Sequence, residues 1–167
     1  MEIRRLSQTD INNFKQIRIS AVEDFPASFY PTKKELDDTP DEEFLMYLTH
    51  SDSRAFFGAI DEGELIGIVG IMRDKRTKLR HKAEVVGMYV RPAFRGRGLA
   101  RQLLNEAIEF ARSYPEIMHL LLEVNSVNQA AKALYLKCGF QSFCLEKNSM
   151  YVDGAYIHQE RMMLALR

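Results

Sequence analysis

Apolar positions in the first forty residues change from strand-like to helix-like spacing. Ile3 to Leu6 is predicted to form a short strand, and Ser7 to Asp10 resembles a capping box at the start of a helix that ends near Asp24. Residues 25–38 contain two prolines and three aromatic side chains, which indicates a structured loop or a broken helix.

The next segment returns to regular spacing. Thr39-Pro40-Asp41-Glu42 predicts a second helix, with a capping hydroxyl, a proline in the first turn and a reciprocal carboxylate. Ala55 to Ile60 and Glu64 to Met72 are rich in β-formers, and the short glycine-containing link between them favours a hairpin. Lys82 to Val90 supplies a third long strand, so a three-strand meander is expected.

Helix-like spacing reappears from Gly98 to Arg112 and stops before Pro115. Ile117 to Val124 is predicted to be a fully buried strand, and Asn128 to Lys137 to be a helix that ends at Gly139. Two closing strands around a turn at Asp153-Gly154 are expected from the ranges Phe140 to Glu146 and Tyr156 to Leu166.

This order of elements predicts an α/β fold with a mixed sheet and helices on both faces. The 167 residues lie within the range of one domain, residues 1–167, and no linker, repeat or low-complexity tract divides them. The composition, 46% hydrophobic and 28% charged, is that of an ordinary globular chain.

Charge and cysteine usage narrow the class of protein further. Lys plus Arg and Asp plus Glu number 23 each, which disfavours a general nucleic-acid binder. The start of the chain lacks the apolar core of a signal peptide and no run reaches membrane-spanning length, so a cytoplasmic protein without membrane contact is expected. Cys138 and Cys144 are expected to be reduced and packed in the core, and no Cys/His spacing indicates a metal site.

The candidate chemistry lies between the third long strand and the helix that begins near Leu99. The chain there reads Arg91-Pro92-Ala93-Phe94-Arg95-Gly96-Arg97-Gly98, and a strand that leads through such a turn into a helix presents free N–H groups to an anion. The turn lacks the third glycine of a dinucleotide fingerprint and the Gly-Lys-Ser/Thr ending of a Walker loop. A phosphate-bearing ligand of another type is therefore expected.

The turn contains the pattern Arg95-x-x-Gly98-x-Ala100. By this pattern the chain resembles the GNAT superfamily of N-acetyltransferases, whose signature is Arg/Gln-x-x-Gly-x-Gly/Ala. A second block reproduces the spacing of another family signature with Val124, Asn128, Ala131, Leu134, Tyr135, Gly139 and Phe140. The resemblance implies a central sheet of about seven strands in which a splayed pair of parallel strands, here 82–90 and 117–124, holds acetyl-CoA in its gap.

The resemblance also implies roles for individual residues. Backbone groups of Met88, Tyr89 and Val90 would pair with the pantetheine arm, and Asn128 would hydrogen-bond it or help to open the strand gap. The pyrophosphate would be wrapped mainly by main-chain N–H groups of Arg95, Gly96, Arg97, Gly98, Leu99, Ala100 and Arg101.

Two residues are candidates for proton transfer. Tyr135 matches the tyrosine that many relatives use as a general acid toward the departing thiolate, and the alternative is a core tyrosine. Glu84 interrupts an apolar strand, where a carboxylate is costly unless it is solvated, paired or used. Some relatives use a glutamate there as general base, and the alternative is an ion pair with Lys82 or Arg73.

The acceptor amine, of a small molecule or a protein, is not specified by these motifs. By resemblance, its site would draw on the first helices and the last hairpin, which carry Glu23, Asp24, Phe25, Phe29, Tyr30, Tyr151 and Tyr156. The sequence leaves open whether the protein forms a homodimer. Two other functions remain as alternatives: a non-catalytic acyl-CoA sensor, and a nucleic-acid-associated protein acting through the basic run Arg73 to Lys82, which the neutral total charge disfavours.

Overall fold

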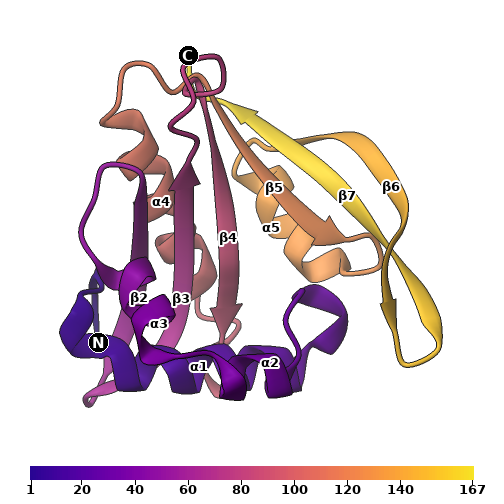
Figure 1. Cartoon of the computed structure of the whole chain (residues 1–167). Coiled ribbons are helices and arrows are strands. Elements are labelled where there is room, and N and C mark those ends of the chain that lie inside the picture. Colours follow the sequence, from indigo (N-terminus) through magenta and orange to yellow (C-terminus); the bar gives the residue numbers. More distant parts are fainter.

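The computed structural model describes residues 1–167, whose seven strands form one mixed sheet in the order β1-β2-β3-β4-β5-β7-β6 (Figure 1). The predicted α/β fold with a sheet of about seven strands is confirmed. The strands are β1 (Glu2–Arg5), β2 (Arg54–Asp61), β3 (Glu64–Arg73), β4 (Lys82–Val90), β5 (His119–Asn125), β6 (Gln141–Val152) and β7 (Ala155–Ala165).

Helices cover both faces of this sheet (Figure 1). One face packs against α1 (Ile11–Asp24), α2 (Lys33–Asp38) and α3 (Asp41–Leu48), and the other against α4 (Leu99–Arg112) and α5 (Gln129–Lys137). Short 3₁₀ turns occur at Gln8–Asp10, Pro26–Ser28 and Pro92–Phe94. Each face has its own apolar cluster, centred on Phe14 and Phe56 under α1 and on Leu103 and Leu104 under α4. No helix is long and apolar enough to cross a membrane.

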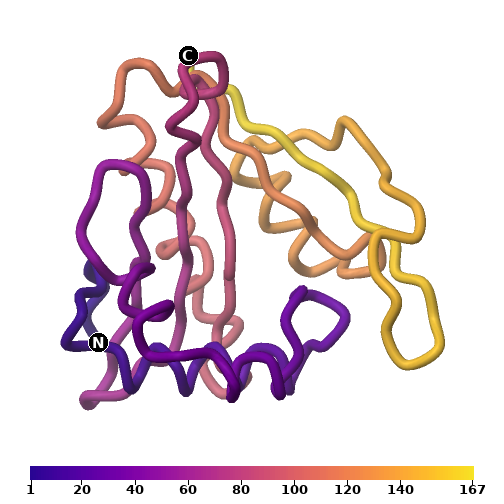
Figure 2. The backbone as a smooth tube through the Cα atoms, in the orientation of Figure 1, coloured from indigo at the N-terminus to yellow at the C-terminus, as the bar shows by residue number.

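The sheet divides where β4 meets β5. These parallel strands pair only from Lys82–Glu84 to His119–Leu121, and no residue of β4 beyond Glu84 pairs with β5. Figures 1 and 2 show the two strands diverging from this end. The part of β4 that has left β5 contains an irregularity in its pairing with β3, between Val86 and Tyr89, where Gly87 has φ +61°. The implied splayed pair is therefore present.

Three details differ from the sequence prediction. Thr39 does not cap α3: Pro40 occupies that position, and the Thr39 hydroxyl instead donates to the Glu35 carbonyl (2.6 Å), which completes α2. β5 is not fully buried, because His119, Leu121 and Glu123 are only half-buried, and the last two line the cleft. β6 continues to Val152, because β7 offers it a hydrogen-bonding partner up to the hairpin turn.

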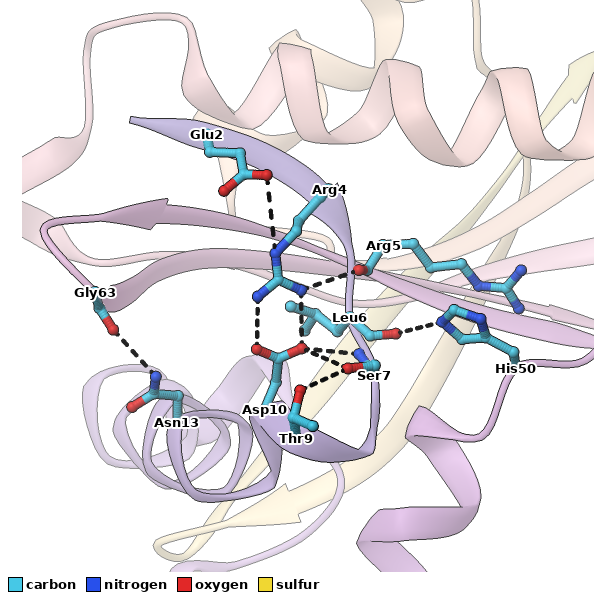
Figure 3. Close-up of polar contacts among 10 residues, drawn as sticks. All are labelled: Glu2, Arg4, Arg5, Leu6, Ser7, Thr9, Asp10, Asn13, His50 and Gly63. Atoms are coloured by element: carbon cyan, nitrogen blue, oxygen red, sulfur yellow. Dashed lines mark hydrogen bonds and ion pairs between the residues drawn. The ribbon is translucent and has the colours of Figure 1, made fainter.

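The N-terminal strand is fixed to α1 by an ion-pair cluster (Figure 3). Arg4 donates two hydrogen bonds to Asp10 (2.9 and 2.8 Å), and the Ser7 N–H donates to the same carboxylate (2.8 Å). This is the reciprocal half of the predicted capping box. Arg4 lowers the pKa of Asp10, so the pair is ionised at neutral pH.

Candidate functional site

The glycine turn leaves an open cradle at the start of α4. Gly98 is the N-cap of α4 with φ +77°, and no side chain caps the helix. Gly96 has φ +75°, and a Cβ atom built on either glycine would meet nothing within 4 Å. The first N–H groups of α4 have no intrahelical acceptor, so this end of a 14-residue helix can receive an anionic group.

A cleft of about 710 Å³ runs from this cradle into the gap between β4 and β5. Most of the predicted cofactor residues line it: Met88, Tyr89, Val90, Arg95, Gly96, Gly98, Leu99, Ala100, Arg101 and Asn128. Arg97 does not, because its guanidinium lies outside against the Phe94 ring (5.8 Å). Asn128 also caps α5, since its Oδ1 accepts from the Ala131 N–H (3.1 Å).

The side chain of Arg95 is engaged within the protein. Its Nε donates to the Val90 carbonyl (2.8 Å), and its guanidinium stacks on Phe25 at 4.4 Å. It therefore holds the turn against β4 and occupies the carbonyl that Val90 would offer a ligand. Main-chain N–H groups remain the principal anion donors of the cradle.

Tyr135 faces the cleft from α5. Its ring is buried against Phe140 (centroids 5.9 Å apart), and its hydroxyl has no hydrogen-bond partner in the chain. Burial, with a smaller contribution from Cys138, raises the pKa of Tyr135 to about 12, so the phenol is protonated at neutral pH. The predicted core position of Cys144 is wrong, since β6 exposes this thiol, while Cys138 is half-buried, and both cysteines are free.

Two carboxylates face each other across the gap, with an arginine between them. The Arg161 guanidinium lies 3.6 Å from Glu84 on β4 and 3.2 Å from Glu123 on β5. The predicted alternative partners of Glu84 are wrong, because Arg73 pairs with Glu116 instead and Lys82 makes no ion pair. The register β5–β7 places Glu123 directly opposite Arg161, and the short β4–β5 pairing brings Glu84 to the same end.

Sequence reasoning missed Glu123. It interrupts the apolar run Leu120 to Val124, which is the same signal that singled out Glu84, but the prediction of a fully buried strand concealed it. Arg161 could be linked to it only through the β5–β7 register. That register depends on the tertiary fold and is not visible in local spacing.

The segment between α1 and α2 closes the acceptor end of the cleft. The Tyr30 hydroxyl donates to the Glu123 carboxylate and lies 2.9 Å from Gln159 Oε1. Asn125 Nδ2 donates to the Ala27 carbonyl (3.0 Å). Burial and the adjacent Glu123 carboxylate raise the pKa of Tyr30 to about 12. Figure 1 shows this segment approaching the end of β5 and the β6–β7 hairpin.

The other expected acceptor residues divide into two groups. Phe25 and Phe29 line the cleft with Tyr30. Tyr151 and Tyr156 do not, because they stack on each other at the tip of the last hairpin, with centroids 5.1 Å apart. Glu23 and Asp24 also lie outside the lining, and Asp24 accepts from the buried Tyr89 hydroxyl (2.5 Å).

The basic segment from Arg73 to Lys82 is remote from the cradle. It precedes β4, whereas the glycine turn follows β4, and a nine-residue strand spans about 30 Å. Its charges are partly neutralised, since Arg76 pairs with Asp74 and Arg73 with Glu116. No group of three or more His, Cys, Asp or Glu side chains is arranged to hold a metal ion.

Comparison with known proteins identifies relatives of this chain. The model of the acetyltransferase (GNAT) family matches residues 15–140. The chain is 40% identical over 101 residues to N-alpha-acetyltransferase RimI of Mycobacterium tuberculosis, a match that covers 60% of each protein. It is 32% identical over 105 residues to streptothricin acetyltransferase of Streptomyces lavendulae, covering 63% of the chain and 53% of that enzyme.

A solved structure agrees over nearly the whole length. The crystal structure of a GNAT-family acetyltransferase from Streptococcus pneumoniae superimposes with a TM-score of 0.89 at 25% identity, covering 98% of both chains. The match to the curated relatives is shorter and spans 60% or less of the length of those named above. The two curated relatives are named for different acceptors, so similarity alone does not assign one here.

Proposed function

Because the chain belongs to the GNAT acetyltransferase family, we propose that it transfers the acetyl group of acetyl-CoA directly to an amine. The observation that carries this proposal is the continuity of one cleft from the glycine cradle, past the unpaired edge of β4 and the Tyr135 hydroxyl, to the two carboxylates. The cradle would hold the diphosphate, the edge would hold the pantetheine arm, and the carboxylate end would admit the amine.

The residues of the cleft fit this co-substrate. Free N–H groups at the start of α4 suit a diphosphate, and Arg101 lines the same opening. The edge of β4 that faces β5 has no strand partner beyond Glu84, and it can offer a ligand hydrogen bonds of the kind that β4 makes with β5 in its first three residues. The Val90 carbonyl is excepted, because it already accepts from Arg95. Acetyl-CoA supplies an activated thioester, and the protein supplies alignment, which contributes much of the rate in such transfers.

Tyr135 is proposed as the general acid toward the departing sulfur. Its free, protonated hydroxyl lines the cleft, so it can donate to the charge that develops on the thiolate. A thiol has a pKa of about 8.5. Since the pKa of Tyr135 is about 12, complete proton transfer is uphill, and a hydrogen bond to the sulfur is the larger part of the contribution.

Glu84 is proposed as the general base that removes a proton from the acceptor ammonium, directly or through water. Its side chain is 55% exposed in the open cleft, and its only ionic partner is Arg161 at 3.6 Å. Glu123 is more engaged, because Tyr30 and Arg161 occupy its two oxygens. Glu84 is therefore the freer of the two carboxylates to accept a proton.

The test is acetyl-CoA turnover with a panel of amines, measured as release of free CoA, together with calorimetric titration of acetyl-CoA. We expect binding and acceptor-dependent release. Binding without release with every amine would support the non-catalytic sensor, and absence of binding would refute the assignment of the cradle.

A further inference from the structure

Arg18 is a guanidinium in the wall of the cleft whose one recorded contact is with the Phe14 ring, 6.0 Å from the ring centroid. It extends from α1 toward β4, where its Nη1 lies 3.3 Å from the position that a Cβ atom on Gly87 would occupy. No carboxylate lies within 4.0 Å of it, and it donates no hydrogen bond to the chain. Its N–H donors are free at the level of the β4 irregularity, in the part of β4 that has left β5.

Three other half-buried arginines, unlike Arg18, are paired with carboxylates. Arg4 pairs with Asp10, Arg73 with Glu116, and Arg161 with Glu123. Burial lowers the pKa of Arg18, which reflects the cost of keeping its charge away from water. An anionic group of a ligand that pairs with the guanidinium would compensate for this cost.

Tyr47 adds a second free donor beside Arg18. It extends from α3, packs on Phe56 (centroids 5.8 Å apart), and its hydroxyl has no hydrogen bond in the chain. Arg18 and Tyr47 also border an adjoining hollow of about 390 Å³. Glu35 and Glu43 line that hollow, but neither lies within 4.0 Å of a basic group there, and Glu35 instead accepts from Thr32.

The two walls of the acceptor end therefore differ in charge. One carries Arg18 and the Tyr47 hydroxyl, and the other carries Glu84 and Glu123, with Arg161 between the two carboxylates. The four ionic side chains sum to zero, which suits a ligand with both signs of charge better than a purely cationic one. An amine bearing only positive groups would place one of them near Arg18.

We propose that the acceptor is a small amine that also carries a carboxylate, such as a free amino acid, with the carboxylate held by Arg18 and Tyr47 and the amine directed to Glu84. This inference rests on the proposed function and names its substrate class. Arg18 is in this assignment an acceptor-binding residue, and its planar fork suits a carboxylate bidentately.

The strap formed by residues 25–31 favours a compact acceptor over a peptide. Tyr30 joins it to β5 and β7 through Glu123 and Gln159, and Asn125 holds its backbone at Ala27. These bonds cross the passage between the α1–α2 segment and the last hairpin. An extended chain that passed between these elements would have to break these bonds, whereas a molecule of amino-acid size would not.

The experiment compares amines that differ only in the carboxylate. The probes are the standard amino acids, the corresponding amino-acid amides, spermidine and an uncharged peptide with a free N-terminus, each assayed by CoA release. We expect the wild-type protein to prefer an amino acid over its amide by about 100-fold in kcat/KM, as for loss of a desolvated charge pair. Arg18→Met should lower kcat/KM for the acid about 100-fold and leave the amide unchanged.

Two variants control for structural damage. Arg18→Lys keeps the charge and should retain part of the preference, and Lys15→Met removes a basic group on α1 that pairs with Asp41 away from the cleft. Lys15→Met should have the wild-type kcat/KM for both the acid and the amide. Arg18→Met should have the wild-type dissociation constant for acetyl-CoA.

The outcomes separate the two levels of the proposal. If Arg18→Met lowers kcat/KM equally for the acid and the amide, the proposed role of Arg18 is wrong. If the wild-type protein prefers amides, spermidine or the peptide, the proposed substrate class is wrong, but acetyl transfer still stands. Acetyl-CoA binding with no turnover of any probe would instead refute the proposed function, and this inference would fall with it.

Discussion

At the scale of single residues, the cleft contains groups whose usual partners are missing. Tyr135 has no acceptor for its hydroxyl, Glu84 has one loose ionic contact, and Arg18 has no anion. In the open cleft these groups face solvent, and a ligand that displaces the solvent must replace its hydrogen bonds. The shared location of these groups on one cleft indicates that ligands provide the missing contacts.

For Tyr135, we expect substitution by phenylalanine to lower kcat about 100-fold, because one donor toward the leaving sulfur is lost. The ring packing against Phe140 stays, so the dissociation constant of acetyl-CoA should change by less than about threefold. Steady-state kinetics and calorimetry check the two quantities. Tyr114→Phe, which follows the C-terminal end of α4 and does not line the cleft, is the matched control. Unchanged turnover in Tyr135→Phe would remove the residue from the acid role.

For Glu84, substitution by glutamine is expected to remove the limb of the pH–rate profile that reports the free base, since an amide cannot accept the ammonium proton. The same profile measured for Glu123→Gln provides the comparison. If only Glu123→Gln changes the pH–rate profile, Glu123 on β5 is the base. If the wild type and both variants have the same profile, neither carboxylate is the base.

At the scale of elements, most of the architecture was predictable because local signals agreed with the fold. The meander, α4 and the hairpin turns follow from spacing and from glycine positions. The placement of Glu123, Arg161 and Arg18 around one cleft could not be predicted in this way, because it depends on the β5–β7 register and on the packing of α1 against β4. Thr39 was misassigned because two helices compete for the same short segment.

The glycine turn gives a test at this scale, because the chain holds a matched position. Gly98 and Gly63 both have positive φ (+77° and +84°), and a Cβ atom on either meets nothing within 4 Å. Valine at each position should cost about 1–2 kcal/mol of unfolding free energy through backbone strain. Only Gly98→Val should also weaken acetyl-CoA binding, by about tenfold or more, and equal affinity of the two variants would contradict the cradle.

At the scale of the whole molecule, stability depends on ties between segments distant in sequence. The pair Arg4–Asp10 fixes the edge strand to α1 (Figure 3). Arg5 donates to the carbonyls of Ser51 and Arg54 (2.8 Å each) at the start of β2. These contacts lie far from the gap. Variants of these residues therefore test the stability of the fold and not the acetyl transfer reaction.

Asp10→Asn should lower the unfolding free energy by about 1 kcal/mol at pH 7. The folded pKa of Asp10 is depressed by Arg4, so this contribution is present above the unfolded pKa of about 4 and is lost as the pH falls through the folded value. Urea unfolding at pH 7 and pH 3 should show the difference shrinking at pH 3. Glu2→Gln, which removes a carboxylate 4.0 Å from Arg4, should have little effect at either pH.

The short pairing of β4 with β5 has a consequence for how the molecule is held together. With three residue pairs at one end, the backbone ladder joining the strands before the gap to those after it is largely absent. A ligand bound along the free edge of β4 would supply hydrogen bonds in place of the missing strand pairs and would connect the two parts of the sheet. Saturating acetyl-CoA should then stabilise the whole sheet, so that the melting temperature of the protein reports how tightly acetyl-CoA is bound.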